Sequence, residues 1–416
     1  PIEELGEILA VDSVLMGALQ VEGEELKLNY QLVRTEDGVT LMSDMVRGPR
    51  DQVFALQEQM ASEVREYFVG EPGPQLLSQS RPENSTAYDR YMVGQDLLGH
   101  RRQTGNLESA IELFEESIAL DPSYGPAYLA LAEIYVLLPD YRGVVIEEAH
   151  AKAIELVEQG IQADPAIEQA AASVYGFVYH KQKKWAEAEA AFKRATGAQV
   201  VEPNAFNWYS LMLGSVGRYD ESLVQGLAGL QRFPTSPILN SRVAIVYTWM
   251  NDMDMASEFY KRARQLGVRG GTHELAHAMH LIRQGDLEGA RQAADIGIMD
   301  GGGSTDWVAP VFNALADSEN RGAALQILNE AAAEASLNPQ VESTVRVLLG
   351  DIEGALRVAR TLVQPGETYE TEFLFLREFK ALWERPEFLE LMTTLGITEY
   401  WQQAGCRWVD FAVDCG

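Results

Sequence analysis

A small residue returns every 34 positions through the middle of the chain, over four successive intervals. The five positions are Ala188, Ser222, Ala256, Ala290 and Ala324. Each lies near the start of a stretch whose apolar residues recur with the period of an amphipathic α-helix. Helix pairs repeated at a fixed interval of this length stack against their neighbours instead of surrounding one core. The spacing therefore predicts a mainly α-helical solenoid.

The same interval is typical of tetratricopeptide (TPR) repeats. Small residues at three positions of each repeat would let the paired helices approach closely, and large residues would fill the remaining space. We expect about eight helix pairs. The chain is expected to divide into a partial α+β module at 1–69, a linker at 70–85, the solenoid at 86–364 and a C-terminal helical cap at 365–416.

The first residues follow a different pattern. Residues 2–10 predict a short helix, and apolar residues then alternate with polar ones over 26–32, which is typical of a half-buried strand. Further strands are expected at 14–21 and, after a turn at Asp37 and Gly38, at 39–46. Asp51 would open a helix. Its expected apolar face consists of Val53, Leu56, Met60, Val64 and Tyr67. These elements predict a three-stranded antiparallel sheet with one helix.

Several short motifs occur in a fixed order along the chain. They are VLMGAL at 14–19, LKLNYQL at 26–32, VFALQ at 53–57, AIELF at 110–114, ALDP at 119–122, EYWQ at 399–402 and RWVDF at 407–411. This order resembles the second half of a TolB-like domain followed by TPR repeats. Such regions are found in bacterial class III adenylate cyclases and in membrane-integrated winged-helix transcription activators.

The resemblance implies a sensory and protein-interaction region on the periplasmic side of the bacterial inner membrane, with a cytoplasmic location as the alternative. The first half of the TolB-like domain and any output domain would precede residue 1. A sheet without that half exposes an edge strand that can pair with another chain, so a homodimer is one expectation.

The composition restricts the partners of this chain. Its 62 acidic and 33 basic residues give a net charge of −29, which repels nucleic-acid phosphates and anionic lipids. We therefore expect no direct contact with nucleic acid. The charge serves solubility in one interpretation and attracts a basic protein partner in the other. The sequence contains no run of 18 apolar residues, so it predicts no membrane span.

The two cysteines, Cys406 and Cys415, lie near the C-terminus. A disulfide between them would suit an oxidising compartment, and two free thiols are the alternative. No histidine lies near them to complete a zinc site. Residues 301–304 (GGGS) lack the lysine of a phosphate-binding loop and predict a turn. We expect no cofactor.

Residues 273–277 read HELAH, which matches the zinc-protease motif H-E-x-x-H. His273 and His277 would share a helix face, Glu274 would act as the base, and His280 adds a third imidazole. The segment falls on the first helix of the sixth repeat, so we interpret it as a polar or half-buried helix face. Metal binding or pH sensing is the alternative, and a zinc-dependent hydrolase is a remote one.

In TPR stacks, positions 2, 5, 9 and 12 of each first helix line a concave groove. The corresponding residues here are Leu129, Glu133, Ser173, Phe177, His180, Asn204, Asn207, Leu211, Ser241, Ile245, Thr248, Met279 and Asn313. They mix apolar and small polar side chains and lack the lysine and asparagine pair that clamps a C-terminal carboxylate.

The first functional hypothesis is a non-enzymatic sensing and interaction region of a membrane-linked regulator. It would bind a peptide, a protein or a small ligand in the groove. The second hypothesis is a free-standing scaffold or assembly adaptor.

Overall fold

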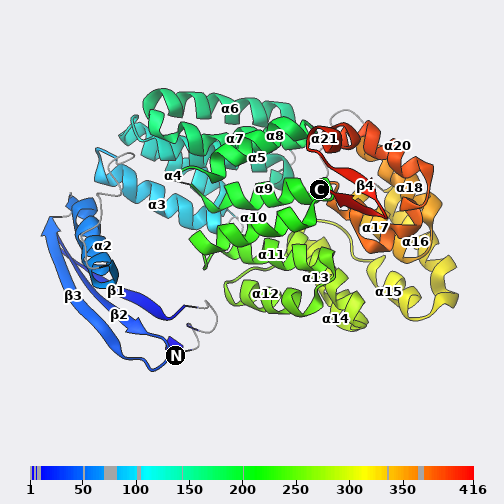
Figure 1. Cartoon of the computed structure of the whole chain (residues 1–416), viewed down its shortest axis with the longest axis horizontal. Coiled ribbons are helices and arrows are strands. Elements are labelled where there is room, and N and C mark those ends of the chain that lie inside the picture. The colour runs from blue at the N-terminus through cyan, green and yellow to red at the C-terminus, as the bar shows by residue number, and fades with distance from the viewer. Residues whose placement is uncertain are drawn as a thin grey trace. The chain divides into compact units, whose positions relative to one another are not determined.

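The computed structural model describes residues 2–3, 6, 11–49, 52–69, 82–100, 105–142, 144–199, 201–334, 337–363 and 370–416 (Figure 1). Most of the helix expected at 2–10 and most of the linker expected at 70–85 lie outside these residues. The chain forms two compact units, Pro1–Val174 and Tyr175–Gly416. In the part of the chain that the structure describes, no helix is both long and apolar enough to cross a membrane.

The first unit begins with the expected three-stranded antiparallel sheet. Strands β1 (Ser13–Glu22), β2 (Glu25–Arg34) and β3 (Thr40–Pro49) pair in chain order, and helix α2 (Val53–Val69) covers one face. Leu26 and Tyr30 of β2 form a small core with Val46 and Leu56. Tyr67 was expected on the packed face of α2, but it is 47% exposed, because the residues that contact the sheet end at Val64.

Strand β1 carries an uncovered apolar row. Leu15, Leu19 and Val21 are directly opposite apolar residues of β2, so they share the face that α2 covers. Their side chains are nevertheless 39%, 58% and 58% exposed. Among the described residues, helix α2 therefore covers β2 and β3, while β1 has no partner strand at its outer edge and its apolar row is exposed.

Two helix pairs complete the first unit, α3 (Ser85–Gly99) with α4 (Asn106–Leu120) and α5 (Gly125–Arg142) with α6 (Ile146–Ala163). Within the first pair, a Cβ atom on Gly94 would lie only 2.7 Å from the Phe114 ring. The absence of a side chain at Gly94 therefore allows the two helices to pack closely. This is the combination of small and large residues that the repeat spacing predicted.

Helix α7 (Glu168–Lys181) crosses the boundary between the units, and further helix pairs follow. The helices of the second unit that follow α7 are α8 (Trp185–Thr196), α9 (Pro203–Ser215), α10 (Tyr219–Arg232), α11 (Pro237–Met250), α12 (Met253–Gln265), α13 (Gly271–Gln284), α14 (Leu287–Asp300), α15 (Val308–Ala316), α16 (Arg321–Ala333), α17 (Pro339–Leu348) and α18 (Ile352–Ala359). The five residues of the 34-residue spacing lie on α8, α10, α12, α14 and α16, and each is at most 1% exposed. The predicted α-solenoid with its small N-terminal sheet is confirmed.

The C-terminal segment follows the short helix η4 (Arg360–Val363). Its elements are η5 (Glu372–Phe375), η6 (Arg377–Phe379), α19 (Lys380–Trp383), α20 (Pro386–Thr394), α21 (Ile397–Gln403) and the hairpin of β4 (Arg407–Val409) with β5 (Ala412–Asp414).

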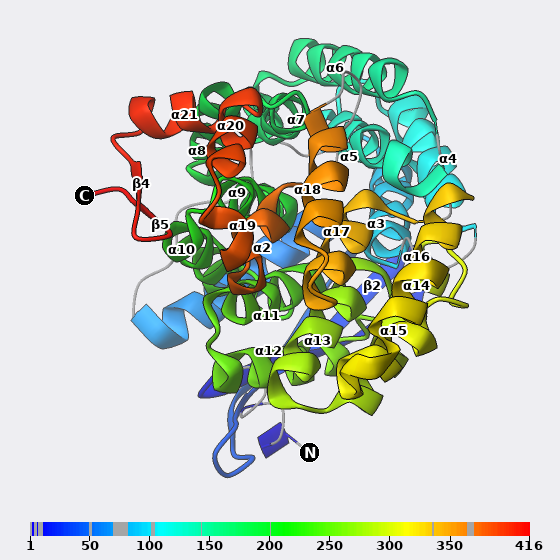
Figure 2. The same ribbon diagram turned by 90° about the vertical axis from the view of Figure 1, so that its right-hand side faces the viewer.

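This segment does more than cap the last helix pair. It touches α18 through α19, and it also returns to the start of the unit, where α21 packs on α8 (Figure 2). There, η5 packs on α9. The indole of Trp185 donates a hydrogen bond of 2.7 Å to the carbonyl oxygen of Leu395. The indole of Trp401 donates one of 2.8 Å to the carbonyl oxygen of Val216. Residues 370–416 therefore link both ends of the second unit.

Candidate functional site

The positions predicted to line the groove are mostly not accessible. The buried ones are Leu129, Glu133, Ser173, Phe177, His180, Ser241, Ile245, Thr248 and Met279, the half-buried ones are Asn204, Asn207 and Leu211, and Asn313 is exposed. In the second unit one of these positions, His180, is covered by a stretch of the same chain, residues 370–379, which we call the groove segment. It lies against the first helices of successive repeats, and its contacts define the candidate site.

The first contact is made by Glu370. One carboxylate oxygen accepts hydrogen bonds from His180 Nε2 at 2.6 Å and from the Ser215 hydroxyl at 3.2 Å. The other accepts a bond of 2.8 Å from Lys181 Nζ. The adjacent Thr371 is fully buried, and its hydroxyl donates to the carbonyl oxygen of Ser215 at 2.6 Å. Helices α7 and α9 thus hold the start of the groove segment.

The second contact is a buried ion pair. Nη2 of Arg242, on α11, donates to Glu372 Oε2 at 2.7 Å, and these side chains are 4% and 7% exposed. The Tyr219 hydroxyl donates to the carbonyl oxygen of Glu372 at 2.7 Å. A Cβ atom on Gly214 would lie 2.7 Å from the guanidinium of Arg242 and 3.0 Å from the carboxylate of Glu372. A glycine at this point of α9 leaves room for the ion pair.

The third contact lies on α13. Nε and Nη2 of Arg283 donate to the two carboxylate oxygens of Glu378, at 2.8 and 2.7 Å. Its remaining nitrogen, Nη1, contacts the carbonyl oxygen of Thr248. Such a two-point arginine–carboxylate pair fixes orientation as well as charge. Three carboxylates of the groove segment are therefore bound by cations of three different first helices.

Apolar side chains of the groove segment fill the space between these polar contacts. Those of Phe373, Leu374, Phe375, Leu376 and Phe379 are all at most 6% exposed. Buried aromatic and aliphatic anchors of this kind supply most of the affinity in peptide complexes, while the charge pairs set register and specificity. The groove segment therefore has the chemistry of a bound peptide ligand.

The charges in the groove determine the ionisation of its acids. Burial alone would raise the pKa of Glu370, but the neighbouring His180 and Lys181 outweigh burial and hold this pKa well below its usual range. Burial lowers the pKa of His180, and the neighbouring carboxylate of Glu370 opposes this shift only in part. At Glu378, burial is likewise outweighed by Arg283, and the pKa of the carboxyl is lowered.

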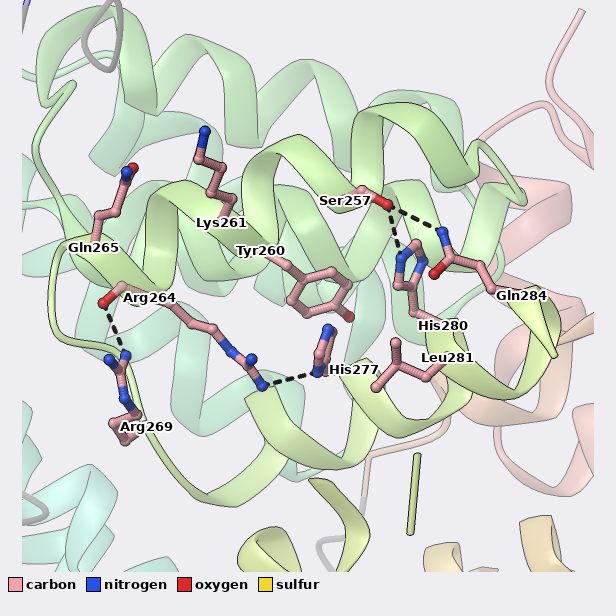
Figure 3. A pocket seen from close by; sticks show the side chains of 10 residues that line it. All are labelled: Ser257, Tyr260, Lys261, Arg264, Gln265, Arg269, His277, His280, Leu281 and Gln284. Carbon is pink, nitrogen blue, oxygen red and sulfur yellow. Dashed lines mark hydrogen bonds between the residues drawn. The ribbon is translucent and has the colours of Figure 1, made fainter. Parts of the chain in front are cut away.

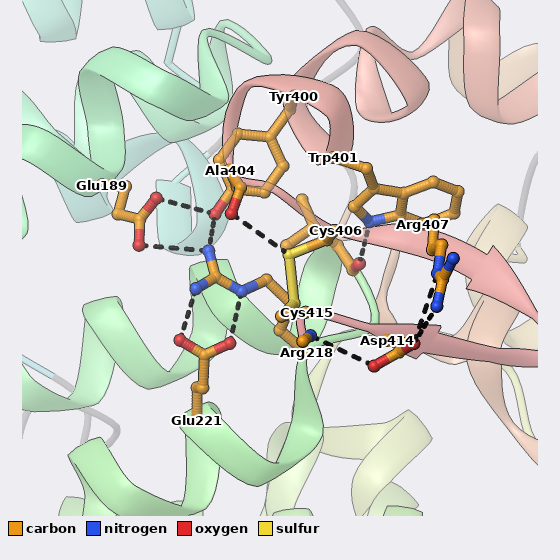
Figure 4. The surroundings of a disulfide bond; sticks show 12 residues. Glu189, Arg218, Glu221, Tyr400, Trp401, Ala404, Cys406, Arg407, Asp414 and Cys415 are labelled. Atoms are coloured by element: carbon orange, nitrogen blue, oxygen red, sulfur yellow. Dashed lines mark hydrogen bonds and ion pairs between the residues drawn. A yellow bond between two sulfur atoms is a disulfide. The ribbon is translucent and has the colours of Figure 1, made fainter.

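A second cluster holds the end of the chain on the start of the second unit (Figure 4). Tyr400 of α21 donates to Glu189 Oε2 at 2.9 Å, and Arg218 contacts the same hydroxyl and donates to Glu189 Oε1 at 3.1 Å. Beside this cluster, Cys406 and Cys415 form a disulfide across the β4–β5 hairpin. The predicted pair is thus bonded in the structure, and no free cysteine remains in the chain.

The two histidines of the HELAH segment and the nearby His280 form a third cluster, on α13. The rings of His273, His277 and His280 surround the Tyr260 ring of α12, with centroid distances of 5.2, 4.5 and 5.3 Å. The three side chains are 5%, 9% and 2% exposed, so the face is more deeply buried than expected. The reason is that this face of α13 packs on α12 and not on solvent.

The donor pattern of this cluster does not suit a catalytic metal. Nη2 of Arg264 donates to both Glu274 Oε2 and His277 Nδ1, at 2.9 and 3.0 Å. The guanidinium is therefore bonded to Glu274 and His277, which a zinc hydrolase would need as its general base and as a metal ligand. Among the described residues, no three histidine, cysteine or acidic side chains are placed to share a metal ion. The arrangement gives no support to the hydrolase alternative.

A pocket opens beside this cluster, between α12 and α13 (Figure 3). Its volume is about 660 Å³. The lining residues are Ser257, Tyr260, Lys261, Arg264, Gln265, Arg269, His277, His280, Leu281 and Gln284. The sequence motif drew attention to the histidines, but nothing in it indicated the three cations at the rim.

The comparisons with known proteins concern the repeats. The tetratricopeptide repeat family model matches residues 101–124, a small part of the chain. No curated protein sequence matches the chain. The extent of the solenoid therefore rests on the spacing and the helix pairs described above.

Several solved structures are similar to parts of the chain. PilW, a type IV pilus biogenesis factor, is 18% identical, with a TM-score of 0.35, over 50% of this chain and 91% of PilW. PilF of Pseudomonas aeruginosa is 19% identical, with a TM-score of 0.34, over 50% of this chain and 90% of PilF. A tetratricopeptide repeat protein of Parabacteroides merdae is 13% identical, with a TM-score of 0.41, over 65% of this chain and 98% of that protein.

Proposed function

We propose that this chain is a non-enzymatic protein-interaction module whose inner groove recognises an acidic segment with aromatic anchors. The groove segment occupies the groove until a partner of similar chemistry displaces it. The observation that carries this proposal is the set of three carboxylates, Glu370, Glu372 and Glu378, each paired with a cation from a different first helix. A groove built for a purely apolar ligand would not place buried cations at such intervals.

The covalent attachment of the groove segment sets a threshold for any partner. A tethered ligand has an effective concentration on the order of 1 mM, so a free peptide with equal contacts competes poorly. A partner that offers a longer segment or a second contact would overcome this. The groove segment would thus suppress weak binding and permit specific binding.

We further propose that the module belongs to a membrane-linked regulator and faces the periplasm. The disulfide between Cys406 and Cys415 suits an oxidising compartment, and the membrane-linked role extends the TolB-like resemblance of the sequence motifs. The free edge of β1 supports a homodimer formed by strand pairing. The net charge of −29 supports a basic partner for the outer surface, whereas the groove favours an acidic one. A free-standing scaffold is the alternative.

A labelled peptide with the sequence of residues 370–379 tests the proposed groove. It would be titrated into the full-length protein and into a Glu378→Gln variant, in which the resident segment has lost its pair with Arg283. The variant should bind the peptide about tenfold more tightly than the wild type, because the resident competitor is weakened. Fluorescence anisotropy measures both affinities.

Two further variants make the result interpretable. Glu390→Gln removes an exposed carboxylate of α20 and should behave like the wild type. Arg242→Gln combined with Arg283→Gln should abolish peptide binding, provided that circular dichroism shows an intact helical fold. If Glu378→Gln binds the peptide no better than Glu390→Gln does, the groove is not a peptide site and the proposal is wrong.

A further inference from the structure

The hairpin of β4 and β5 lies on one residue of the groove segment. Trp408 and Val413 are directly opposite each other in the hairpin, so their side chains share one face. The ring centroids of Trp408 and Phe375 are 6.0 Å apart. A Cβ atom on Gly217, between α9 and α10, would lie 2.8 Å from Phe375 and 2.9 Å from Val413. Phe375 of the groove segment therefore contacts both the solenoid and the hairpin.

Trp408 also joins the hairpin to the rest of the C-terminal segment. Its ring centroid lies 5.8, 5.2 and 5.8 Å from those of Trp383, Phe388 and Trp401, which belong to α19, α20 and α21. Aromatic pairs at such distances stabilise a fold beyond the area that they bury. Opening of the hairpin would remove Trp408 from this cluster and uncover Phe375.

The backbone of the hairpin gives little support to this arrangement. The hairpin has only three residue pairs, and a two-stranded hairpin is at best marginally stable by itself. Its turn residues, Asp410 and Phe411, have φ angles of 50° and 65°, a conformation that a bulky side chain such as that of Phe411 disfavours. The disulfide between Cys406 and Cys415 joins the strands at the open end (Figure 4). The covalent bond therefore supplies the closure that the turn does not.

The disulfide is less shielded on one side than on the other. Cys406 is 6% exposed, whereas Cys415 is half-buried and lies between the exposed Asp414 and Gly416. A thiolate of an external dithiol can bond to the sulfur of Cys415 while the sulfur of Cys406 leaves as a thiolate. The second thiolate of the dithiol then displaces Cys415. The dithiol becomes a disulfide, and its two electrons and two protons pass to the cysteines of the chain.

We propose that thiol–disulfide exchange at Cys406 and Cys415, with a dithiol as the reductant, controls release of the groove segment. In the oxidised chain, the hairpin holds Trp408 and Val413 against Phe375, and the groove segment stays bound. Reduction frees the hairpin and uncovers Phe375, so the groove segment detaches more often. Only the last step, entry of a partner into the vacated groove, rests on the proposed function.

Hydrogen–deuterium exchange of the full-length protein, with and without dithiothreitol, tests this proposal. The chain has two cysteines, so the reductant acts on this bond alone. Reduction should make exchange over 372–379 about tenfold or more faster and leave exchange over α14 unchanged. Unchanged exchange over 372–379 would overturn the proposal. An equal increase over α14 would overturn it too, because the bond would then stabilise the whole unit.

Matched variants show whether Trp408 transmits the effect. Trp408→Ala should exchange fast over 372–379 in both redox states, while Val409→Ala, on the exposed face of the hairpin, should respond like the wild type. Cys406→Ser combined with Cys415→Ser should exchange like the reduced wild type and ignore dithiothreitol. A full response to dithiothreitol in Trp408→Ala, or slow exchange over 372–379 in the double serine variant, would contradict the proposal.

Titration of the labelled 370–379 peptide separates this inference from the proposed function. Reduction should tighten peptide binding about tenfold, because the resident competitor is weakened. If exchange over 372–379 responds to reduction and the peptide binds in neither state, the redox control stands and the proposed function is wrong. If the peptide binds equally in both states and exchange does not respond, the redox control alone is wrong.

Discussion

Arg283 and Glu378 are 95 positions apart, yet the guanidinium of one donates to both carboxylate oxygens of the other, at 2.8 and 2.7 Å. The side chains are 2% and 14% exposed, so this ion pair is withdrawn from solvent. It joins the sixth first helix of the solenoid to a segment that follows the last helix pair. Long-range pairs of this kind turn a row of repeats into a closed unit.

Replacement of Arg283 by glutamine should lower the free energy of unfolding by about 3–5 kcal/mol, since Glu378 would remain buried and uncompensated. Urea denaturation followed by circular dichroism measures this loss. Arg262→Gln should cost no more than about 1 kcal/mol, because its partner Glu258 is exposed. Equal losses in both variants would contradict the buried character of the Arg283 pair.

Acid should release the groove segment. The pKa values of Glu370 and Glu378 are lowered in the folded protein, against a usual value of 4.5. The unfolded chain therefore binds more protons in the window below about pH 4.5, and stability is lost as the pH falls through it. Limited proteolysis from pH 5 to pH 3 should show cleavage near 370–379 before cleavage within α9 or α11. Cleavage of the helices first would contradict this prediction.

The histidines on α13 should add a second loss at higher pH. Burial lowers the pKa of His273 and of His280 from 6.5 to about 4. Because the unfolded imidazoles take up protons first, each group lowers stability as the pH falls from 6.5 towards 4, by up to about 3 kcal/mol. A His280→Gln variant should lose less stability than the wild type between pH 6.5 and pH 4. Parallel curves for the two proteins would exclude a role for His280.

The space at Gly214 should be needed for the pair between Arg242 and Glu372. In a Gly214→Ala variant the new methyl group would lie 2.7 Å from the guanidinium and would displace it. We expect a net loss of about 1–2 kcal/mol, although alanine favours the helix. Gly322→Ala on α16 has open space around it and should be neutral or stabilising. Thermal unfolding of both variants tests the contrast.

Loss of the disulfide should loosen the C-terminal hairpin. Closing a segment of nine residues stabilises a folded chain by about 2–3 kcal/mol in the loop-entropy model. Cys406→Ser combined with Cys415→Ser should lower the melting temperature by several degrees. The double variant should also be insensitive to dithiothreitol, whereas the wild type should lose stability in it. An unchanged melting temperature would show that the bond contributes nothing.

The repeat architecture could be predicted from the sequence because it depends on packing between helices that are neighbours along the chain. Ala188 and the four residues at the same repeat position must be small wherever two helices meet, so the spacing itself records the fold. The strands at the N-terminus were equally clear, because the alternation over 26–32 has the period of a half-buried strand. Each of the two signals can be recognised from residues that lie within a few dozen positions of one another.

The occupation of the groove by residues 370–379 could not be predicted, because it depends on contacts between distant parts of the chain. Glu370 and His180 are 190 positions apart, and the groove segment contains only two very short helices, η5 and η6. Nothing in the sequence of such a segment says which surface it covers. The depth of burial of the HELAH segment could not be predicted for a related reason. Its polar face packs against Tyr260 of a neighbouring helix, and a single-helix pattern cannot show that contact.

Hydrogen–deuterium exchange of the full-length protein tests most directly whether the chain fills its own groove. The amide of Leu374 bonds to Thr371 and that of Phe379 to Leu376, and both lie in buried surroundings. We predict slow exchange over 370–379 in the wild type and faster exchange, by about tenfold or more, in Arg242→Gln combined with Arg283→Gln. Exchange over 370–379 at the rate of an unprotected peptide in the wild type would contradict the account.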